Sequence, residues 1–539
     1  MSGTRGGARL VGIDLARLVA VAGMMAAHTL HRGDQPPPAG VVALIDGPPS
    51  TLFAVLGGVS VVLAARSRLA IGDRGGAVRS TLARGLAVAL LGFLVIPLAG
   101  AVYVVLVPFG VAIMVAALLV LLPTWLLVAL ATLLAAGSGW LVALARERLP
   151  GLEGAHSVVQ LLGDPLAVAN DVLLNGVYPA LTWTAYLAIG ILVARAILAA
   201  RRAGRERWAL VGLAGGGALL VAAGIAASEI GVRVLAGGRD AGAARDELLA
   251  NAYGAVGSTE PAFQLLAAPH SGTPADIART AGIALLVIAL LGLLASALPA
   301  AALRVIEPAR AAGGAPLTIY IVHVVLISVM GGLLVGAAPW AVGGWSGWAL
   351  QLLIALGIGA VLAAQGRRGP FERLVGWIAG RAGGRHEAGE PQPYELAGDT
   401  GIVYEWRFRA PIDEVWRALT EPELLRAWIA DPQLPVTSAW SDLRTGGSYR
   451  LEHRRSAGDL VVRGEYLQVE PPTLLVESLH AEGDGRPPVL STSMLAQHGD
   501  VTTVRVREEW ESPQLRGDAL GEMRVVAAMR HRLAALVER

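Results

Sequence analysis

Ten long apolar runs fill the first 375 residues, and no other feature constrains the fold of the chain as strongly. A helix that spans a bilayer needs about 20 consecutive, mostly apolar residues. Only 16% of the residues are charged, against about 25% in soluble globular proteins. The sequence therefore predicts a polytopic α-helical membrane domain with about ten transmembrane helices, at residues 10–30, 50–66, 80–97, 101–121, 123–145, 177–199, 208–229, 278–299, 314–336 and 345–365.

The composition changes near residue 380. Residues 1–380 carry the apolar runs, whereas residues 399–539 have the mixed polarity of a soluble domain. Between them, residues 381–398 are rich in charged residues, Gly and Pro, which is typical of a linker. We therefore expect a membrane domain over 1–380, a linker over 381–398 and a separate domain over 399–539.

Arginines in the short loops predict the orientation of the helices. Basic residues near the ends of membrane helices accumulate on the cytoplasmic side. With ten spans, five arginine clusters and both termini fall on one face, so we expect a cell (inner) membrane protein whose termini and C-terminal domain are cytoplasmic. Arg146 and Arg148 fall on the opposite face and are the main exception. The clusters are Arg5 and Arg9; Arg66, Arg68, Arg74 and Arg79; Arg201, Arg202, Arg205 and Arg207; Arg304 and Arg310; and Arg367 and Arg368.

Composition also excludes several kinds of chemistry. The chain has no cysteine, which rules out disulfides, thiol catalysis and thiolate metal sites. All 44 basic residues are arginine, so lysine Schiff bases and phosphate-loop lysines are absent. A net charge of +2 gives no reason to expect nucleic acid as a partner. The scattered His and Asp residues lack the local spacing of a metal site.

Ionisable residues inside membrane spans are rare and often functional. Asp14 and Arg17 stand three residues apart on the first helix, and they either form a mutual ion pair or bind substrate. His323, in the ninth span, is either hydrogen-bonded to a neighbouring helix or a proton-transfer group. His28 ends the first span, and it is either an interfacial polar residue or a catalytic one.

Five motifs in order resemble one family of membrane proteins. The family is that of bacterial proteins related to heparan-α-glucosaminide N-acetyltransferase, and the resemblance covers about residues 9–380. The motifs lie around Asp14 and His28; from Asp46 to Ser60; from Asn175 to Gly190; around His270 and Pro274; and from Ala315 to His323, with Gly369–Leu374 closing the match.

This resemblance implies a membrane transferase that moves an acyl (acetyl) group from an acyl-CoA to a carbohydrate or other polar acceptor. Such chemistry needs a base or nucleophile and donors for the oxyanion. We assign the base, its orienting carboxylate and an acceptor contact to His28, Asp46 and His270. Tyr178 and Ser271 are expected to donate hydrogen bonds, and Asp14, Arg17 and His323 complete the predicted substrate-binding set. The chain departs from the animal enzyme, because the segment around Pro36 lacks the histidine expected there.

A transporter or translocase of a small polar or lipid-linked solute is the alternative function. Intramembrane Asp14, Arg17 and His323 and a glycine-rich seventh span would suit a polar pathway. Those glycines also fit close helix packing. They are Gly212, Gly215, Gly216, Gly217 and Gly224.

The C-terminal region has the pattern of an α+β domain. Residues 402–408 alternate like a strand, and two short helices are predicted at 413–419 and 422–428. Strand-like runs follow at 447–453, 459–470, 473–481, 486–496 and 501–510. A final helix is predicted at 516–538, where apolar residues recur every three or four positions.

This order resembles the helix-grip (START-like, SRPBCC) fold. The segments Ala410–Trp428 and Asp442–Tyr449 resemble the branch named for the activator of the heat-shock-protein-90 ATPase. The resemblance implies either a packed core or a cavity for a small apolar ligand, and the partner can equally be another protein. The expected lining residues are Trp416, Trp428, Trp440, Tyr449, Tyr466, Met494, Met523 and Met529.

Overall fold

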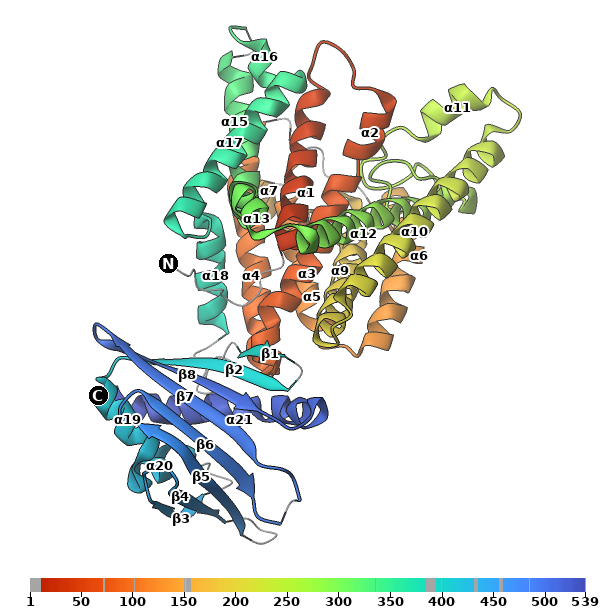
Figure 1. Cartoon of the computed structure of the whole chain (residues 1–539). Helices are drawn as coiled ribbons and strands as arrows, with labels where there is room; N and C mark the ends of the chain where they lie inside the picture. Colours follow the sequence, from red (N-terminus) through yellow and green to blue (C-terminus); the bar gives the residue numbers. More distant parts are fainter. Residues whose placement is uncertain are drawn as a thin grey trace. The chain divides into compact units, whose positions relative to one another are not determined.

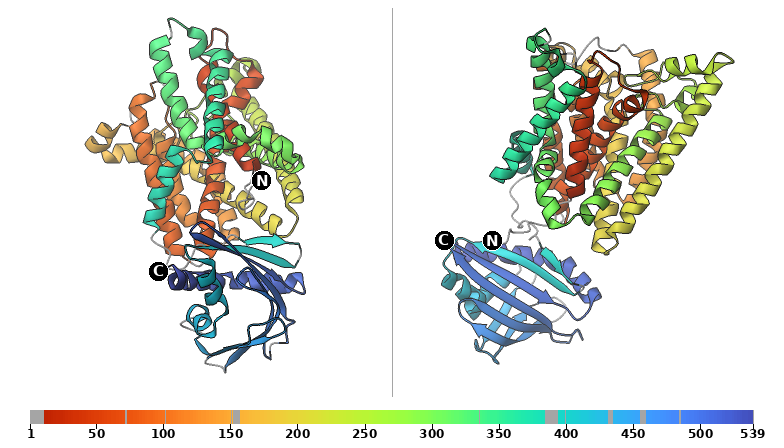
Figure 2. Two further views of the ribbon diagram at one scale, coloured as in Figure 1. Left: turned by 60° about the vertical axis from the view of Figure 1, so that its left-hand side comes forward. Right: turned by 45° about the horizontal axis from the view of Figure 1, so that its top comes forward.

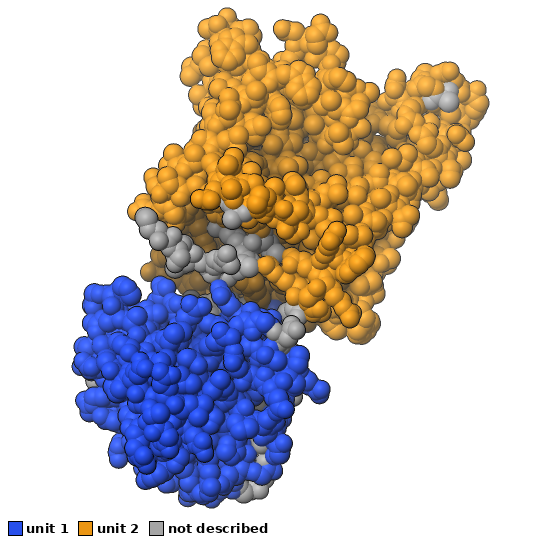
Figure 3. Space-filling model, viewed as in Figure 1, with its two compact units in different colours: residues 1–9, 67–73, 385–539 blue, residues 10–66, 74–384 orange. Residues whose placement is uncertain are grey.

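The computed structural model divides into two compact units (Figure 3). It describes residues 11–538 except 71–72, 101, 150, 152–156, 335, 384–393, 399, 431–434, 455–458 and 484, and it leaves out the side chains of 67, 70, 202, 241, 300, 518 and 520–524. One unit comprises residues 10–66 and 74–384 and is called here the membrane unit. The other comprises residues 1–9, 67–73 and 385–539, and its 394–538 part is called the C-terminal unit.

All regular secondary structure among the described residues of the membrane unit is helical, and every predicted span contains a helix (Figure 1). Among the described residues, nine helices are long and apolar enough to cross a membrane. This confirms a polytopic membrane domain. The helices at the predicted spans are α1 (Val11–Leu30), α3 (Pro48–Ala70), α4 (Arg74–Val95), α5 (Leu106–Leu119), α6 (Thr124–Arg148), α9 (Ala180–Arg202), α10 (Glu206–Ala236), α12 (Pro274–Ala297), α15 (Pro316–Leu334) and α17 (Gly344–Gln365).

Shorter elements connect these helices. They are α2 (Ala39–Ile45), α7 (Val158–Gly163), α8 (Pro165–Asn170), α11 (Ala241–Leu248), α13 (Ala300–Val305), α14 (Glu307–Gly313), α16 (Pro339–Val342) and α18 (Pro370–Ala382), with single turns η1 (Ile96–Leu98), η2 (Asp171–Asn175) and η3 (Pro261–Leu265).

Helix α5 is the exception among the predicted spans. It has 14 residues, which at 1.5 Å per residue span about 21 Å, less than the roughly 30 Å of a bilayer core. The segment before it is not helical, yet Val102, Val104 and Val105 are buried. The Val105 N–H donates to the Tyr320 hydroxyl at 3.2 Å. Non-helical backbone is tolerated at membrane depth where protein surrounds it, and this segment meets that condition.

Helix α1 is the centre of the membrane unit. It contacts α2, α12, α14, α15 and α17, and in the right-hand view of Figure 2 its red ribbon lies among the other helices of this unit. Small residues let these neighbours approach closely: a Cβ on Gly313 would lie 1.8 Å from the Asp14 carbonyl oxygen. The helix that carries His28 is therefore fixed on several sides.

Close packing explains only part of the glycine-rich seventh span, which is α10. Helices α10 and α12 pack along each other. A Cβ on Gly217 would lie 2.7 Å from the Gly282 carbonyl oxygen, and one on Gly224 would lie 2.6 Å from that of Ala275. By contrast, a Cβ on Gly212, Gly215 or Gly216 would meet nothing within 4 Å. Two of the five glycines are thus required by the contact with α12.

The C-terminal unit is an eight-stranded antiparallel sheet with three helices, which confirms the predicted helix-grip architecture (Figure 1). The strand order is β1-β2-β8-β7-β6-β5-β4-β3. The sequence analysis missed β1 and β3, which are short edge strands. The elements are β1 (Tyr394–Ala397), β2 (Gly401–Phe408), α19 (Ile412–Thr420), α20 (Pro422–Ile429), β3 (Val436–Ser441), β4 (Ser448–His453), β5 (Leu460–Glu470), β6 (Leu474–Ala481), β7 (Val489–His498), β8 (Val501–Glu509) and α21 (Pro513–Val537).

Leucine at position 217 should disrupt the α10–α12 contact, whereas leucine at position 216 should not. We expect Gly217→Leu to reduce the yield of monodisperse protein in detergent and its unfolding temperature, because the side chain would meet α12 backbone. Gly216→Leu is the matched control, since its Cβ enters open space. Equal yields and unfolding temperatures for the two variants would contradict this packing.

Candidate functional site

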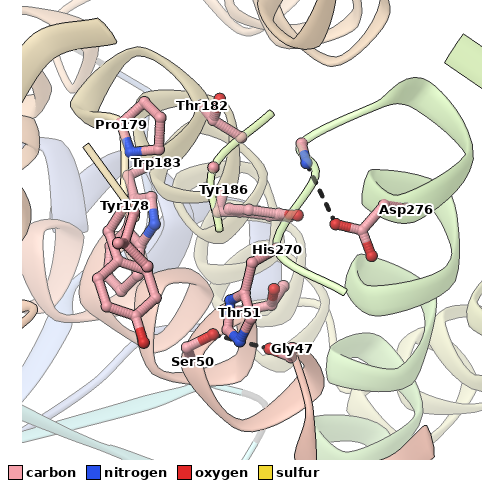
Figure 4. A pocket seen from close by; sticks show the side chains of 13 residues that line it. Gly47, Ser50, Thr51, Tyr178, Pro179, Thr182, Trp183, Tyr186, His270 and Asp276 are labelled. Atoms are coloured by element: carbon pink, nitrogen blue, oxygen red, sulfur yellow. Dashed lines mark hydrogen bonds between the residues drawn. The ribbon is translucent and has the colours of Figure 1, made fainter. Parts of the chain in front are cut away.

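Two adjoining pockets lie within the membrane unit. The first, shown in Figure 4, holds about 320 Å³ of empty space including its open mouth, and the second holds about 350 Å³. Ser50, Tyr178 and His270 line both pockets and form the wall between them. The first pocket is called here the Thr182 pocket and the second the His28 pocket, each after one of its lining residues. Three of the predicted site residues therefore meet here, namely His28, Tyr178 and His270.

A chain of hydrogen bonds runs from the His28 pocket into the bundle. His28 Nδ1 lies 2.8 Å from His323 Nε2, and the two rings lie end to end in nearly one plane, with centroids 5.1 Å apart. His323 Nδ1 in turn bonds the side-chain oxygen of Gln351 on α17. With the Gln351 amide in this orientation, its oxygen accepts from His323 Nδ1, so in the neutral rings Nε2 of His323 accepts the proton of His28 Nδ1. This arrangement leaves Nε2 of a neutral His28 without a proton.

Asp46 does not orient His28, because the structure pairs Asp46 with a different histidine. Its Oδ1 lies 3.0 Å from His31 Nε2, and this pair is partly open to solvent. Both residues precede α3, on the segment that follows α1. The predicted pair of Asp46 with His28 is thus absent from the described structure. His28 is instead hydrogen-bonded to His323 of α15, which bonds Gln351 of α17.

His270 lies on the turn before α12 with φ of +58°, a left-handed conformation that is uncommon for a residue with a side chain. Its ring packs edge-on against Tyr178, with centroids 5.4 Å apart. Desolvation lowers the pKa of His270 to about 4, although the nearby Asp46 charge opposes the shift. His270 is therefore neutral near pH 7 and can accept or donate a hydrogen bond.

Tyr178 is the neighbour of His270 in the wall between the two pockets. Burial raises the pKa of its hydroxyl above the ordinary value for tyrosine, and the nearby Asp46 charge adds to the shift. The hydroxyl therefore stays protonated and can donate a hydrogen bond.

The sequence analysis missed Asp276, which lines the Thr182 pocket (Figure 4). It lies in the first turn of α12, capped by Thr273, and its Oδ2 accepts from the Gly272 N–H at 3.3 Å. Its Oδ1 lies 3.3 Å from Arg279. The signal available was an Asp and an Arg three residues apart at the start of an apolar helix, but the predicted span began after Asp276.

Ser271 is fully buried beneath the same turn. Its hydroxyl lies 3.2 Å from that of Thr273, and it lines neither pocket. The structure thus gives Ser271 a part in shaping the turn that carries His270.

Asp14 and Arg17 lie far from both pockets. Asp14 precedes His28 by 14 residues on one helix, a rise of about 21 Å. Asp14 pairs with Arg17 at 2.8 Å and with Arg310 at 3.5 Å, and Arg17 also donates to Ser60. These contacts favour the ion-pair interpretation over a role at the pockets.

Arg146, the exception among the predicted topogenic arginines, joins two segments behind the wall. Its guanidinium donates to the carbonyl oxygens of Asn175 and Gly176, just before Tyr178, and of Ala252 and Tyr253. The second segment is paired with the turn of His270, because the Gly254 N–H donates to the His270 carbonyl at 2.8 Å. One side chain therefore links the backbones that position Tyr178 and His270.

In the C-terminal unit, the four predicted aromatic residues Trp416, Trp428, Tyr449 and Tyr466 lie in one buried cluster. Met529 packs at its edge, and the side chain of Met523 lies outside the described residues. Two further assignments were wrong: Trp440 is 55% exposed and Met494 is 44% exposed. Both lie on strands, where alternate side chains point to opposite faces, and both fall on the outer face.

A carboxyl group lies among these aromatic side chains. Glu477 on β6 bonds the Tyr449 hydroxyl, and desolvation raises the pKa of Glu477 to about 7. Gly464 makes room for the Tyr449 ring, because a Cβ there would lie 2.3 Å from it. The inner face of the sheet is thus apolar with a polar patch.

No group of three or more His, Cys, Asp or Glu side chains that could hold a metal occurs among the described residues.

Glu477 predicts a pH-dependent stability. Its raised pKa means that the folded state favours the protonated carboxyl, so this stabilisation is present below about pH 4.5 and is lost as pH rises through about 7. In a fragment of residues 394–539, which contains the whole sheet, the unfolding temperature should fall less from pH 5 to pH 8 for Glu477→Gln than for the wild type. Circular dichroism measures it. Glu465→Gln, on the exposed face of β5, is the control and should follow the wild type; an identical fall in all three would exclude this role.

Comparison with solved structures returns small bacterial proteins. A protein from Rhodobacter sphaeroides is 22% identical over 26% of this chain and 94% of its own, with a TM-score of 0.25. A protein from Nitrosomonas europaea is 19% identical over 26% of this chain and 97% of its own, with a TM-score of 0.23. A protein from Chromobacterium violaceum is 23% identical over 26% of this chain and 98% of its own, with a TM-score of 0.22. No curated protein matched the chain.

Two family models match the chain. The model described as activator of Hsp90 ATPase homolog 1-like protein matches residues 409–538, in agreement with the predicted resemblance of this region. The model described as acyltransferase domain matches residues 10–364. Neither model supports the narrower resemblance to heparan-α-glucosaminide N-acetyltransferase, which stays a prediction. Since the second match takes in about two thirds of the chain and both pockets, the chain belongs to the acyltransferase-domain family of multi-pass membrane proteins.

Proposed function

We propose that the membrane unit transfers an acyl group from an acyl-CoA to the hydroxyl of a carbohydrate or other polar acceptor, with His28 as the base. The observation that carries this proposal is the chain His28–His323–Gln351, which ends in an unprotonated imidazole nitrogen at the His28 pocket. A histidine whose second nitrogen is held by a hydrogen bond is a common arrangement for a general base.

The reaction balances with the groups present. His28 Nε2 takes the proton of the acceptor hydroxyl as that oxygen attacks the thioester carbonyl. The oxyanion that forms is stabilised by donors on the dividing wall, of which the protonated Tyr178 hydroxyl is one. The carbon–sulfur bond then breaks, and the thiolate takes the proton back from His28. The products are an acylated acceptor and the free thiol of coenzyme A.

The C-terminal unit is proposed to bind a small apolar ligand or a protein partner. The buried aromatic cluster around Trp416 and Tyr466 supports the former. We further propose that both termini are cytoplasmic in the cell membrane, as the arginine clusters indicate.

Replacement of the proposed base should abolish turnover. We expect His28→Ala to lower kcat by roughly 10²- to 10⁴-fold, the usual contribution of a general base. The assay follows release of free thiol from acyl-CoA by purified protein in detergent, where a transporter would show no turnover. His31→Ala is the control and should change kcat less than tenfold, because His31 lines neither pocket. Full activity of His28→Ala would overturn the assignment.

Arg146 lines neither pocket, so its loss should affect turnover through the positions of Tyr178 and His270. Because a misplacement of about 1 Å can cost about 100-fold in rate, we expect Arg146→Met to lower kcat roughly 10- to 100-fold. Arg146→Lys should not restore it, because one ammonium group lacks the forked donors that reach four carbonyls. Exposed Arg148→Met is the control. If Arg146→Met retains wild-type kcat, the link between the two segments is not needed for the reaction.

A further inference from the structure

The two pockets differ in chemistry although they share a wall. Besides the three residues that it shares with the other pocket, the His28 pocket is lined by His28, two tyrosines and apolar side chains. The tyrosines are Tyr103 and Tyr320, and the apolar side chains include Met24, Ile45 and Val105. The Thr182 pocket is lined by hydroxyl groups, one carboxylate and three glycines. An apolar group and a polar group can therefore be held on opposite sides of Ser50, Tyr178 and His270.

Thr182 stands out among the buried threonines of the membrane unit. Thr29, Thr81, Thr184 and Thr280 each donate to the carbonyl oxygen four residues earlier. The Thr182 hydroxyl, in a side chain only 4% exposed, has no hydrogen-bond partner in the part of the chain that the structure describes. A buried hydroxyl without a partner is costly, so an unsatisfied one that lines a pocket indicates a group that a ligand completes.

Backbone groups add to the polar character of this pocket. Its three lining glycines, Gly47, Gly254 and Gly272, all have positive φ, at 104°, 108° and 63°. A Cβ on Gly254 would lie 2.2 Å from the Gly176 carbonyl oxygen, so no side chain fits there. Close packing thus keeps backbone groups instead of side chains at this part of the lining.

The charges of the lining are balanced. Asp276 is paired with Arg279, and His270 is neutral near pH 7. The described lining therefore offers neither an unbalanced cation for a phosphate nor an unbalanced carboxylate for an amine. Trp183 adds an aromatic side chain, of the kind against which the C–H face of a sugar ring packs.

We propose that the Thr182 pocket is the acceptor subsite and that it takes the hydroxyl-bearing part of an uncharged polyol, while the His28 pocket takes the acyl group. The hydroxyl groups, the buried Thr182 oxygen without a described partner and the balanced charge of the lining support this assignment. Thr182 is a specificity-determining residue in this assignment. The inference rests on the proposed acyl transfer and gives the acceptor its chemical class.

Direct binding tests the subsite without reference to turnover. Isothermal titration calorimetry of the full-length protein in detergent uses methyl glycosides of glucose, galactose, mannose and N-acetylglucosamine as probes. We expect saturable binding of at least one probe by the wild type and an affinity about three- to tenfold lower for Thr182→Val, as for one lost neutral hydrogen bond. Thr184→Val is the control, since its hydroxyl is bonded within α9. Binding of no probe, or equal loss in both variants, would overturn the subsite.

Thr182→Val should also retain its unfolding temperature, because it removes a hydroxyl that has no partner in the described structure. A large fall in that temperature would contradict the assignment. Turnover separates this proposal from the proposed function. If acyl-CoA is discharged but Thr182→Val leaves the KM of the bound glycoside unchanged, the subsite is wrong and the transferase stands. If Thr182→Val weakens glycoside binding but no acyl-CoA is discharged, the subsite stands and the transferase is wrong.

Discussion

The site depends on polar groups that satisfy one another inside an apolar helical bundle. Hydrocarbon offers no hydrogen bonds, so a buried imidazole or carboxylate persists only with a hydrogen-bonding partner on its own or a neighbouring helix. His28 finds His323, which finds Gln351, and Asp276 finds Arg279. Against this background the Thr182 hydroxyl is informative, because it lines a pocket and has no hydrogen-bond partner among the described residues.

The backbone of the site is held as tightly as its side chains. The turn of His270 has a left-handed residue, the adjacent segment contains Tyr253 at φ of +44°, and Arg146 caps carbonyl oxygens on two segments. Non-helical backbone with unmet carbonyls would be unstable at this position. A guanidinium with a rigid fork of donors meets several of them at once, which explains an arginine that departs from the predicted orientation of the spans.

The C-terminal unit follows a different rule. Its strands alternate, so burial depends on parity: Tyr449 and Tyr466 lie inside while Trp440 and Met494 lie outside. Residue type alone placed all four in the interior. The period-two pattern of each strand was visible in the sequence, but its phase became certain only from the pairing of neighbouring strands.

The sequence by itself determined the membrane helices, the α+β domain and most of the ionisable candidates, because hydrophobic length and periodicity are local properties. It could not determine which candidates meet. His28 and His323 are 295 positions apart. Asp46 was assigned to His28 but pairs with His31, because the sequence does not show which of two nearby imidazoles the carboxylate faces. It also missed Asp276, and it did not show that α5 is short. Only the tertiary structure decided which candidates meet, since a site built from several helices exists only when they are assembled.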